Sequence, residues 1–320
     1  MSYELIILRH GKSDWNTNET DYNRPVTDRG KRGAQRIGVW LTQNGLKPDM
    51  VISSPAERAR LTAQKMMKAM GETDHYIIYD ERVYEAALND LLDVLSGISR
   101  ETKRVILVGH NPGLEQLLIY LCDERITIPG DGKLLPTATL AHLSLSCQWN
   151  KIRKNSAKLI KIQRPKSLAK KFPYPSFDSD EQRIRPAYYY TQSSVIPYRY
   201  NKGELEVLLI LSSKKKHYVI PKGIKEPGLS LRESAEKEAL EEAGVKGKVA
   251  IQPIGSYNYE KWEATCTVNV YPMEVTFMLD ENDWQERHRT REWHKPDAAS
   301  EKLFQQALKP MVLDLIDYNK

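Results

Sequence analysis

The stretch "YELIILRHG", residues 3–11, begins the chain with an apolar run that ends at Arg9 and His10. A short run of this kind is typical of a strand buried in a parallel sheet. Similar runs follow at 49–53, 75–79 and 104–109, with two later ones at 138–146 and 157–163. Helical patterns separate the first four runs, over 28–44, 55–70 and 86–97, and a further one follows at 114–122. This alternation predicts an α/β domain with a central, mostly parallel sheet and flanking helices.

Cationic and titratable side chains follow three of the predicted strands. Arg9 and His10 end the first, Arg58 begins the helix after the second, and His110 follows the run at 104–109. Because the carboxyl ends of parallel strands meet at one edge of a sheet, we expect these four side chains to lie close together. Arginine forks bind phosphoryl oxygens, a neutral imidazole can attack phosphorus, and a second histidine can bind the equatorial oxygens. Each residue alone would be an ordinary turn residue, but their joint placement favours phosphate chemistry.

Four stretches occur in the order found in the histidine phosphatase superfamily. They are "LRHGKSDW" (8–15), "NRPVTDRGKRGAQRIGVWL" (23–41), "SSPAERARLTAQ" (53–64) and "ILVGHNPGLEQL" (106–117). Over roughly residues 1–165 the chain resembles the short SixA-type phosphohistidine phosphatases of that superfamily. The resemblance implies His10 as nucleophile, with Arg9, Arg58 and His110 as the phosphate pocket, Arg24 at its edge, and no metal or cofactor.

The resemblance leaves the general acid open. Larger superfamily members protonate the leaving group with a carboxylate that follows the second arginine. In "DERVYEAALNDLL" (80–92) the candidates are Glu81 and Glu85, and Glu85 is the one we expect. A weak acid function favours a phosphohistidine or a small phosphomonoester as substrate.

The second half of the chain has a different pattern. Strand-like runs occur at 188–200, 205–213, 217–221, 249–260 and 265–279, with one helix ending near 243 and another over 297–318. Strands with two helices predict an α+β domain. We place the domains at 1–168 and 187–320, with a linker at 169–186. The run 151–171 carries nine Lys or Arg and no acid, and it is either a solvated surface or an anion-binding one.

The stretch "GIKEPGLSLRESAEKEALEEAGV" (223–245) predicts a helix that ends at Gly244, the left-handed cap position. Glu238, Glu241 and Glu242 fall on one face of this helix, and Ala235, Ala239 and Ala243 form an adjacent small, apolar stripe that could pack closely on a sheet. Like charges at this spacing repel by a few tenths of a kcal/mol, and the helix dipole disfavours anions in the last turn by ~0.3–1 kcal/mol each. A divalent cation would reverse that sign. Charge placement alone leaves a solvated acidic helix and a metal site as alternatives.

The same stretch resembles the Nudix box. The matching residues are Gly223, Glu238, Ala239, Glu241, Glu242, Gly244 and Val245, whereas Leu229 replaces a glutamate and Lys237 an arginine. "PIGSYNYEKW" (253–262), "VNVYPMEVTFML" (268–279) and "WQERHRTREWHKPDAA" (284–299) resemble the branch that includes diphosphoinositol polyphosphate and diadenosine polyphosphate hydrolases. The resemblance implies an α/β/α sandwich and Mg²⁺ or Mn²⁺ held by the three glutamates. Basic residues nearby, among them Lys222, Arg289 and Arg291, are either contacts for a polyphosphate or solvated surface charges.

Together these patterns predict a bifunctional phosphohydrolase. The N-terminal domain would be a metal-independent phosphatase, and the C-terminal domain would cleave a diphosphate linkage in a nucleoside polyphosphate, a dinucleoside polyphosphate or an inositol pyrophosphate with Mg²⁺. The alternative is one active phosphatase domain joined to a Nudix domain that senses a ligand without catalysis. The expected partner is a phosphorylated small molecule or a phosphohistidine protein, and a homodimer is compatible with the sequence.

Composition bears on location and on other partners. The net charge is +6, but the basic run 151–171 has no interleaved aromatic residues, so nucleic-acid binding is not favoured. Three scattered cysteines without CxxC spacing predict neither a disulfide framework nor a zinc site. No apolar run has the length of a membrane span, and a strand that begins at residue 3 leaves no room for a signal peptide. We expect a cytoplasmic protein.

Overall fold

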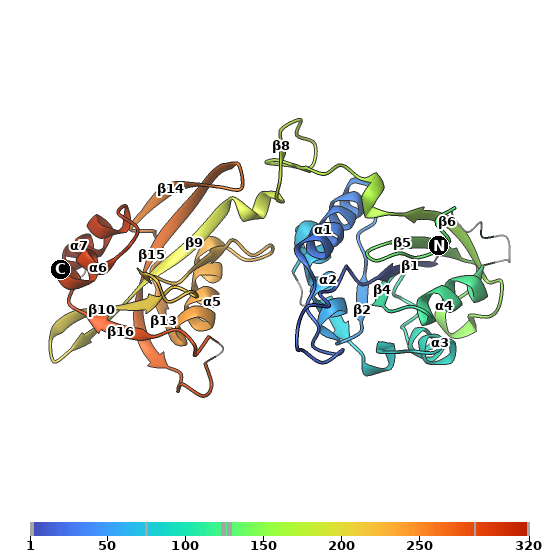
Figure 1. The fold of residues 1–320 in the computed structure, drawn as a ribbon, viewed down its shortest axis with the longest axis horizontal. Coiled ribbons are helices and arrows are strands. Elements are labelled where there is room, and N and C mark those ends of the chain that lie inside the picture. Colours follow the sequence, from blue (N-terminus) through green and yellow to red (C-terminus); the bar gives the residue numbers. More distant parts are fainter. Residues whose placement is uncertain (1–2, 74–75, 123–125, 127–129, 285, 319–320) are drawn as a thin grey trace. The chain divides into compact units, whose positions relative to one another are not determined.

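The computed structural model describes residues 3–318 apart from 74–75, 123–125, 127–129 and 285. The chain forms two compact units, which are described separately (Figure 1). The N-terminal unit comprises Met1–Phe172 and Phe177–Ser179, and the C-terminal unit comprises Pro173–Ser176 and Asp180–Lys320. No helix in the described part of the chain has the length and apolar character needed to cross a membrane.

The N-terminal unit is built on a six-stranded sheet in the order β3-β2-β4-β1-β5-β6. The strands β3, β2, β4 and β1 pair in parallel, whereas β5 and β6 are antiparallel. The prediction of a mostly parallel sheet is confirmed. Residue 75, the first of the predicted third strand, lies outside the described residues. The elements are β1 (Tyr3–Arg9), α1 (Asp28–Gln43), β2 (Met50–Ser53), α2 (Glu57–Ala69), β3 (Ile77–Tyr79), α3 (Leu88–Ser96), β4 (Arg104–Gly109), α4 (Gly113–Leu121), β5 (Leu140–Leu145) and β6 (Ala157–Gln163).

Helices cover both faces of this sheet. A hydrophobic core lies on each face of the sheet. Alternate residues of β1 contribute to one core or the other, because successive side chains of a strand point to opposite faces. Ile6 and Leu8 pack with α1 and α2, and Leu5 and Ile7 pack with α3 and α4. All four side chains are fully buried. Both faces of β1 are therefore apolar from Leu5 to Leu8, and the polar residues Arg9 and His10 follow at its carboxyl end.

The segment predicted as a linker contains a two-stranded sheet of β7 (Phe172–Pro173) and β8 (Gln182–Arg183). Between these two strands, the Tyr174 amide donates a hydrogen bond to the Glu181 carbonyl at 2.9 Å. Phe172 is buried against Val39 and Ala69 of the N-terminal unit. This part of the chain is thus more ordered than its proline-rich, polar composition suggested.

The C-terminal unit is built on an eight-stranded sheet. Its central path is β11-β10-β9-β15-β13, and β12 pairs with β9, β14 with β15, and β16 with β10. The elements are β9 (Thr191–Asn201), β10 (Glu204–Leu211), β11 (Tyr218–Val219), β12 (Lys222–Ile224), α5 (Leu231–Ala243), β13 (Val245–Val249), β14 (Gly255–Lys261), β15 (Ala264–Met278), β16 (Arg291–His294), α6 (Pro296–Lys302) and α7 (Leu308–Tyr318).

Helices lie on both faces of this second sheet, as in a sandwich. Ala235, Ala239 and Ala243 of α5 are fully buried against one face, where they form the small-residue stripe that the sequence predicted. The helices α6 and α7 pack on the other face through residues such as Leu308 and Val312. The α/β/α arrangement expected for this half is confirmed.

Two details of the C-terminal unit differ from the sequence prediction. The helix predicted over 297–318 is interrupted, so the described residues of this unit form three α-helices instead of the predicted two. Leu303 adopts an extended conformation and is buried, and the Phe304 amide donates to the Tyr218 carbonyl at 3.2 Å. The run predicted as one strand over 249–260 belongs to β13 and β14, which pair with successive parts of β15. Long-range pairing, which periodicity does not record, decides both cases.

Candidate active sites

Two histidines meet at the carboxyl edge of the first sheet. His10 follows β1, and its amide donates to the carbonyl of Gly109, the last residue of β4, at 3.1 Å. His110 follows β4, and its ring centroid lies 5.1 Å from that of His10. Arg58 lies in the first turn of α2. The structure therefore brings together the residues that the strand-end pattern had singled out.

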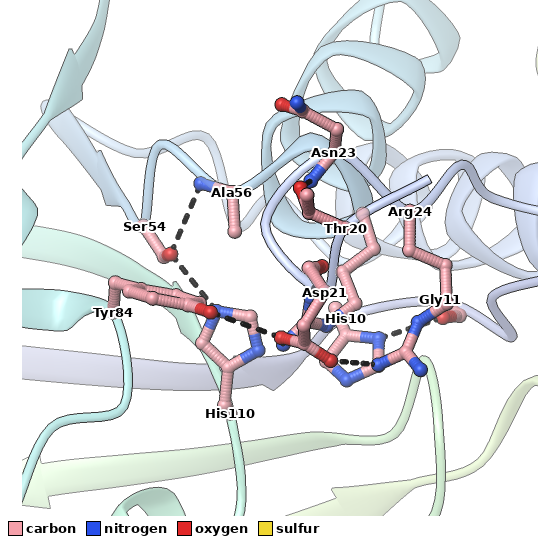
Figure 2. A network of polar contacts seen from close by, with 11 residues as sticks. His10, Gly11, Thr20, Asp21, Asn23, Arg24, Ser54, Ala56, Tyr84 and His110 are labelled. Carbon is pink, nitrogen blue, oxygen red and sulfur yellow. Dashed lines mark hydrogen bonds and ion pairs between the residues drawn. The ribbon is translucent and has the colours of Figure 1, made fainter. Parts of the chain in front are cut away.

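The ring of His10 is fixed by a backbone contact. Its Nδ1 lies 2.8 Å from the carbonyl oxygen of Gly11 (Figure 2). Because a carbonyl oxygen only accepts hydrogen bonds, Nδ1 carries the proton and donates. The lone pair of a neutral ring is then on Nε2. Burial lowers the pKa of His10 to about 4, and the positive charge of Arg58 adds to this shift. His10 is accordingly a neutral imidazole with a free Nε2 lone pair at neutral pH.

His110 is neutral for a similar reason. Burial and the neighbouring His10 ring lower its pKa to about 3. Its Nε2 lies 2.8 Å from Ser54 Oγ, and this oxygen accepts a hydrogen bond from the Ala56 amide at 3.3 Å. Within the described residues, Nδ1 of His110 is buried without a hydrogen-bond partner. Ser54 fixes one side of this ring and leaves the other nitrogen for a ligand.

Two buried arginines converge on one carboxylate beside the histidines. Arg58 Nη2 lies 2.8 Å from Asp21 Oδ2, and Arg24 Nη2 forms an ion pair with Asp21 Oδ1. Tyr84 donates its hydroxyl to Asp21 Oδ2 at 3.0 Å (Figure 2). Burial opposes ionisation of Asp21, but the Tyr84 hydrogen bond and the Arg58 charge outweigh it and lower the pKa of this carboxyl.

Arg9 borders a cleft on another side of His10. Its Nη1 donates to the Leu135 carbonyl at 2.8 Å. The cleft has a volume of about 400 Å³, and its lining includes Lys12, Lys133 and Glu115. The Nε atoms of Arg9, Arg24 and Arg58 are buried, and none has a hydrogen-bond partner among the described residues. Unsatisfied cationic donors around a neutral histidine form a site suited to an oxyanion.

The two carboxylates considered as general acids lie differently. Glu85 is exposed and has a left-handed backbone conformation, with φ of 49°. Glu81 is exposed and accepts a hydrogen bond from the Tyr22 hydroxyl at 3.1 Å. Asp21, which contacts the arginines directly, was missed by sequence reasoning. It lies in a loop without periodicity, and its only signal is its place three residues before Arg24.

In the C-terminal unit, the acidic face of α5 packs on the short strand β12. A Cβ added to Gly223 would lie 1.8 Å from Glu238 Oε1, so the glycine makes room for this carboxylate. The Lys222 amide donates to Glu242 Oε2 at 2.9 Å. The helix ends at Gly244 with φ of 63°, as the sequence predicted. The backbone of β12 therefore positions two of the three glutamates.

The three glutamates of α5 differ in their contacts with neighbouring cationic side chains. Glu242 pairs with Arg289 at 2.7 Å, and Lys237 Nζ lies 3.4 Å from both Glu241 and the buried Glu226. Burial, followed by the charges of Glu242 and Glu241, raises the pKa of Glu238 to about 8. At neutral pH Glu238 is therefore largely protonated, because its surroundings do not offset a third negative charge in this cluster.

These contacts test whether the residues suit a divalent cation. Carboxylate oxygens are the donors that Mg²⁺ and Mn²⁺ prefer. The raised pKa of Glu238 is the effect expected where a bound cation would offset repulsion among carboxylates. Among the described residues, however, no three His, Cys, Asp or Glu side chains are arranged to hold a metal ion. The carboxylate oxygens therefore suit a divalent cation in their chemistry, while Glu241 forms an ion pair with Lys237 and Glu242 with Arg289.

The cationic residues predicted to contact a polyphosphate lie in two places in this unit. Lys222 Nζ donates to Gln192 Oε1 at 2.9 Å and to the Tyr259 hydroxyl at 3.1 Å, next to the acidic face. Burial lowers the pKa of Lys222. Arg291 instead donates to the carbonyls of Ala243 and Leu279, so it caps the end of α5. Of the cations predicted to meet a polyphosphate, Lys222 and Arg289 border the glutamates directly.

Sequence comparison relates the chain to known proteins. It is 29% identical over 168 residues to an uncharacterised protein of Mycobacterium tuberculosis, covering 50% of this chain and 100% of that protein. It is 31% identical over 140 residues to a 2,3-bisphosphoglycerate-dependent phosphoglycerate mutase of Brucella anthropi, covering 43% of this chain. That alignment spans 64% of the mutase, less than two thirds of its length.

Among solved structures, the chain is similar to the protein histidine phosphatase SixA complexed with tungstate. The identity is 18%, the coverage is 51% of this chain and 97% of that one, and the TM-score is 0.42. It is also similar to an Ap4A hydrolase of C. elegans, with 19% identity, coverage of 41% and 98%, and a TM-score of 0.35.

Two family models match separate parts of the chain. Residues 5–93 match the histidine phosphatase superfamily (branch 1), and residues 191–315 match the NUDIX domain. Each match falls within one of the two compact units. The chain therefore contains a histidine phosphatase domain followed by a NUDIX domain, and both families consist of hydrolases that act on phosphoester or pyrophosphate bonds.

Proposed function

We propose that the N-terminal unit is a metal-independent phosphatase that works through a phosphohistidine on His10. The observation that carries this proposal is the neutral ring of His10, whose Nδ1–H is held by the Gly11 carbonyl. Its Nε2 lone pair is free to attack phosphorus. Arg9, Arg24 and Arg58 surround it with positive charge, and all three lower its pKa.

Each neighbouring residue has a physical task in this reaction. The arginine donors bind the phosphoryl oxygens and stabilise the charge that spreads over them in the transition state. When the Ser54 hydroxyl donates to Nε2 of His110, Nδ1 carries the proton and can donate a hydrogen bond to the phosphoryl group. The preferred substrate class is a phosphohistidine or a small phosphomonoester.

For the C-terminal unit we propose hydrolysis of a diphosphate linkage. Glu238, Glu241 and Glu242 would hold a divalent cation, with Lys222 and Arg289 beside them to meet phosphoryl oxygens. When bound, such a cation polarises phosphoryl oxygens and lowers the pKa of a coordinated water. Glu238, with its raised pKa, is suited to accept a proton at its carboxylate. The substrate class is a nucleoside polyphosphate, a dinucleoside polyphosphate or an inositol pyrophosphate.

A second candidate function for this unit is ligand sensing without catalysis. The observation that favours it is the pairing of Glu241 with Lys237 and of Glu242 with Arg289. These ion pairs satisfy two of the three glutamates without a metal. A unit of this kind would bind a polyphosphate through its cations and leave it intact.

The phosphatase proposal is tested with the purified full chain and p-nitrophenyl phosphate or a phosphohistidine peptide. Phosphate release should continue in EDTA and should be lost in His10→Ala, while His217→Ala, at an exposed histidine in the other unit, should retain it. A radiolabelled phosphoenzyme that is labile in acid and stable in base should form only when His10 is present. Activity that persists in His10→Ala, or that stops in EDTA, would refute the assignment.

The second test uses a panel of nucleoside polyphosphates, diadenosine polyphosphates and inositol pyrophosphates. Cleavage should require Mg²⁺ or Mn²⁺ and should fail in Glu241→Gln and Glu242→Gln. Glu236→Gln, at an exposed position of the same helix, should cleave normally. Binding of panel members without cleavage, at equal affinity in all four proteins, would favour the sensor.

A further inference from the structure

The carboxylate of Asp21 occupies an unusual position in the phosphatase site. One oxygen pairs with Arg24 (Figure 2). The other pairs with Arg58, whose Nη1 also donates to the Asp21 carbonyl at 2.5 Å. The Asp21 side chain is 44% exposed, whereas those of Arg24 and Arg58 are 9% and 6% exposed. An accessible anion thus lies over two buried cations.

This arrangement resembles the one that a phosphoryl group requires. Two oxygens of a planar anion join two guanidinium groups, and phosphoryl oxygens bind the same donors. Substrate and Asp21 therefore compete for the same N–H groups. We propose that the phosphoryl group of the substrate displaces Asp21 from Arg24 and Arg58, and that the released carboxyl group then delivers the proton to the leaving group. The inference rests on the phosphatase function proposed above.

Charge explains how one carboxyl can fill both roles. The groups that face Asp21 are Arg24 in its own loop, Arg58 of α2, Tyr84 in the turn after β3, and His110 after β4. While the arginines pair with Asp21, the carboxylate is the favoured form. A bound phosphoryl group takes over the arginines and adds negative charge nearby, and both changes favour protonation. Phosphate binding and proton uptake at Asp21 are then coupled, and each promotes the other by the same factor.

The reaction balances with this residue as acid and base. In the first step His10 Nε2 forms a bond to phosphorus, the bond to the leaving group breaks, and the leaving atom takes the Asp21 proton. In the second step water attacks phosphorus, the P–N bond breaks, and the carboxylate of Asp21 accepts the proton from the water. Inorganic phosphate leaves, Asp21 releases the proton that it took up on substrate binding and pairs with Arg24 and Arg58 again, and His10 is again a neutral imidazole.

Asp21 is better placed for this task than the carboxylates considered from the sequence. It contacts Arg58 directly, and the Tyr84 ring that binds it is 5.7 Å from the His110 ring. Glu85 is exposed, and Glu81 is engaged by Tyr22. A short loop movement that lets Asp21 leave the arginines keeps it next to the phosphoryl group.

The test compares the full-length chain with its Asp21→Asn variant in two measurements. The first is the affinity for inorganic phosphate, measured by calorimetry without turnover. It should rise by roughly 5- to 150-fold in the variant, because a neutral amide competes poorly for the arginines. In the unmodified chain, calorimetry in buffers of different ionisation enthalpy should show proton uptake on phosphate binding. The variant should show less uptake.

The second measurement is turnover of phenyl phosphate and p-nitrophenyl phosphate. The phenolate of the first needs a proton, so kcat should fall by about 100- to 10,000-fold in Asp21→Asn. p-Nitrophenolate leaves without one, so its kcat should fall by less than about tenfold. Asp21→Glu should restore part of the phenyl phosphate rate. Glu19→Gln, which removes an exposed carboxylate from the same loop, should match the unmodified chain in every assay.

The outcomes separate the two proposals. Equal losses on both substrates together with unchanged phosphate affinity would mean that Asp21 only holds the arginines in place, and the inference would be wrong. Turnover that does not depend on His10 would refute the phosphatase mechanism. The phosphate affinities and proton uptake would still show whether Asp21 is displaced.

Discussion

Gly223→Ala is the substitution that most directly probes the acidic site of the C-terminal unit. The added Cβ would lie 1.8 Å from Glu238 Oε1 and 2.0 Å from its Cδ. Non-bonded contacts of this kind are essentially never below 3.0 Å, so the carboxylate must move by about 1.2 Å. The clash is with the far end of a flexible side chain, so we expect the unfolding free energy to change by less than about 1 kcal/mol.

The expected loss of activity is much larger than the loss of stability. A displacement of about 1 Å in a catalytic group costs on the order of 100-fold in rate. Cleavage of the best diphosphate substrate should therefore fall about 100-fold in Gly223→Ala, and calorimetric affinity for Mg²⁺ should fall with it. Phosphate release by the N-terminal unit should not change, which makes it an internal control for folding and concentration.

A double-mutant cycle identifies the cause of the loss. If the alanine acts by displacing Glu238, then adding it to a Glu238→Gln chain should reduce the residual rate little further, because the two changes share one contact. Additive losses would show that Gly223 matters for another reason. Unchanged cleavage in Gly223→Ala would refute the idea that the Glu238 carboxylate is held in a functional position.

The other predictions concern stability. Because the pKa values of His10 and His110 are lowered to about 4 and 3, the unfolded chain takes up their protons first as pH falls through about 6.5. The free energy of unfolding of the N-terminal unit should therefore fall by roughly 3 kcal/mol per histidine by pH 4. His10→Gln should reduce this fall, as measured by hydrogen exchange in β1. An equal fall in the variant would contradict the prediction. Gly38→Ala would place a Cβ 2.3 Å from the Met66 carbonyl oxygen and should cost about 1–3 kcal/mol in urea unfolding, whereas Gly97→Ala, whose Cβ would be 3.7 Å from its nearest contact, should cost much less. Ser230→Ala removes the side-chain cap of α5 and should destabilise the C-terminal unit by about 0.5–2 kcal/mol, measured by the same method; no change would mean that the cap is dispensable.

The sequence predicted those features that depend on local pattern. The strands of the first sheet and the placement of His10 and His110 at their ends follow from apolar runs with a polar end. The end of α5 at Gly244 and the buried alanine stripe follow from helical periodicity and a glycine cap. In each case the feature depends on residues that are neighbours in the sequence, so a single sequence is enough to predict it.

Features that depend on contacts between distant segments were not predictable in this way. The interruption before α7 arises because Phe304 bonds to Tyr218, and β16 forms because it pairs with β10. Asp21 reaches the arginines from a loop, where no period fixes the direction of a side chain. The ion pair between Glu242 and Arg289 joins residues 47 positions apart.

The acidic last turn of α5 sets stability against function. Glu238, Glu241 and Glu242 repel one another at the end of a helix whose dipole disfavours them. Lys237, Arg289 and the Arg291 cap compensate only in part, since the pKa of Glu238 remains raised. A neutral substitution of Glu238 should therefore raise the melting temperature while it impairs the site, the opposite of what a core substitution does. Selection of this chain for heat resistance alone would favour changes at Glu238 and would thereby select against activity.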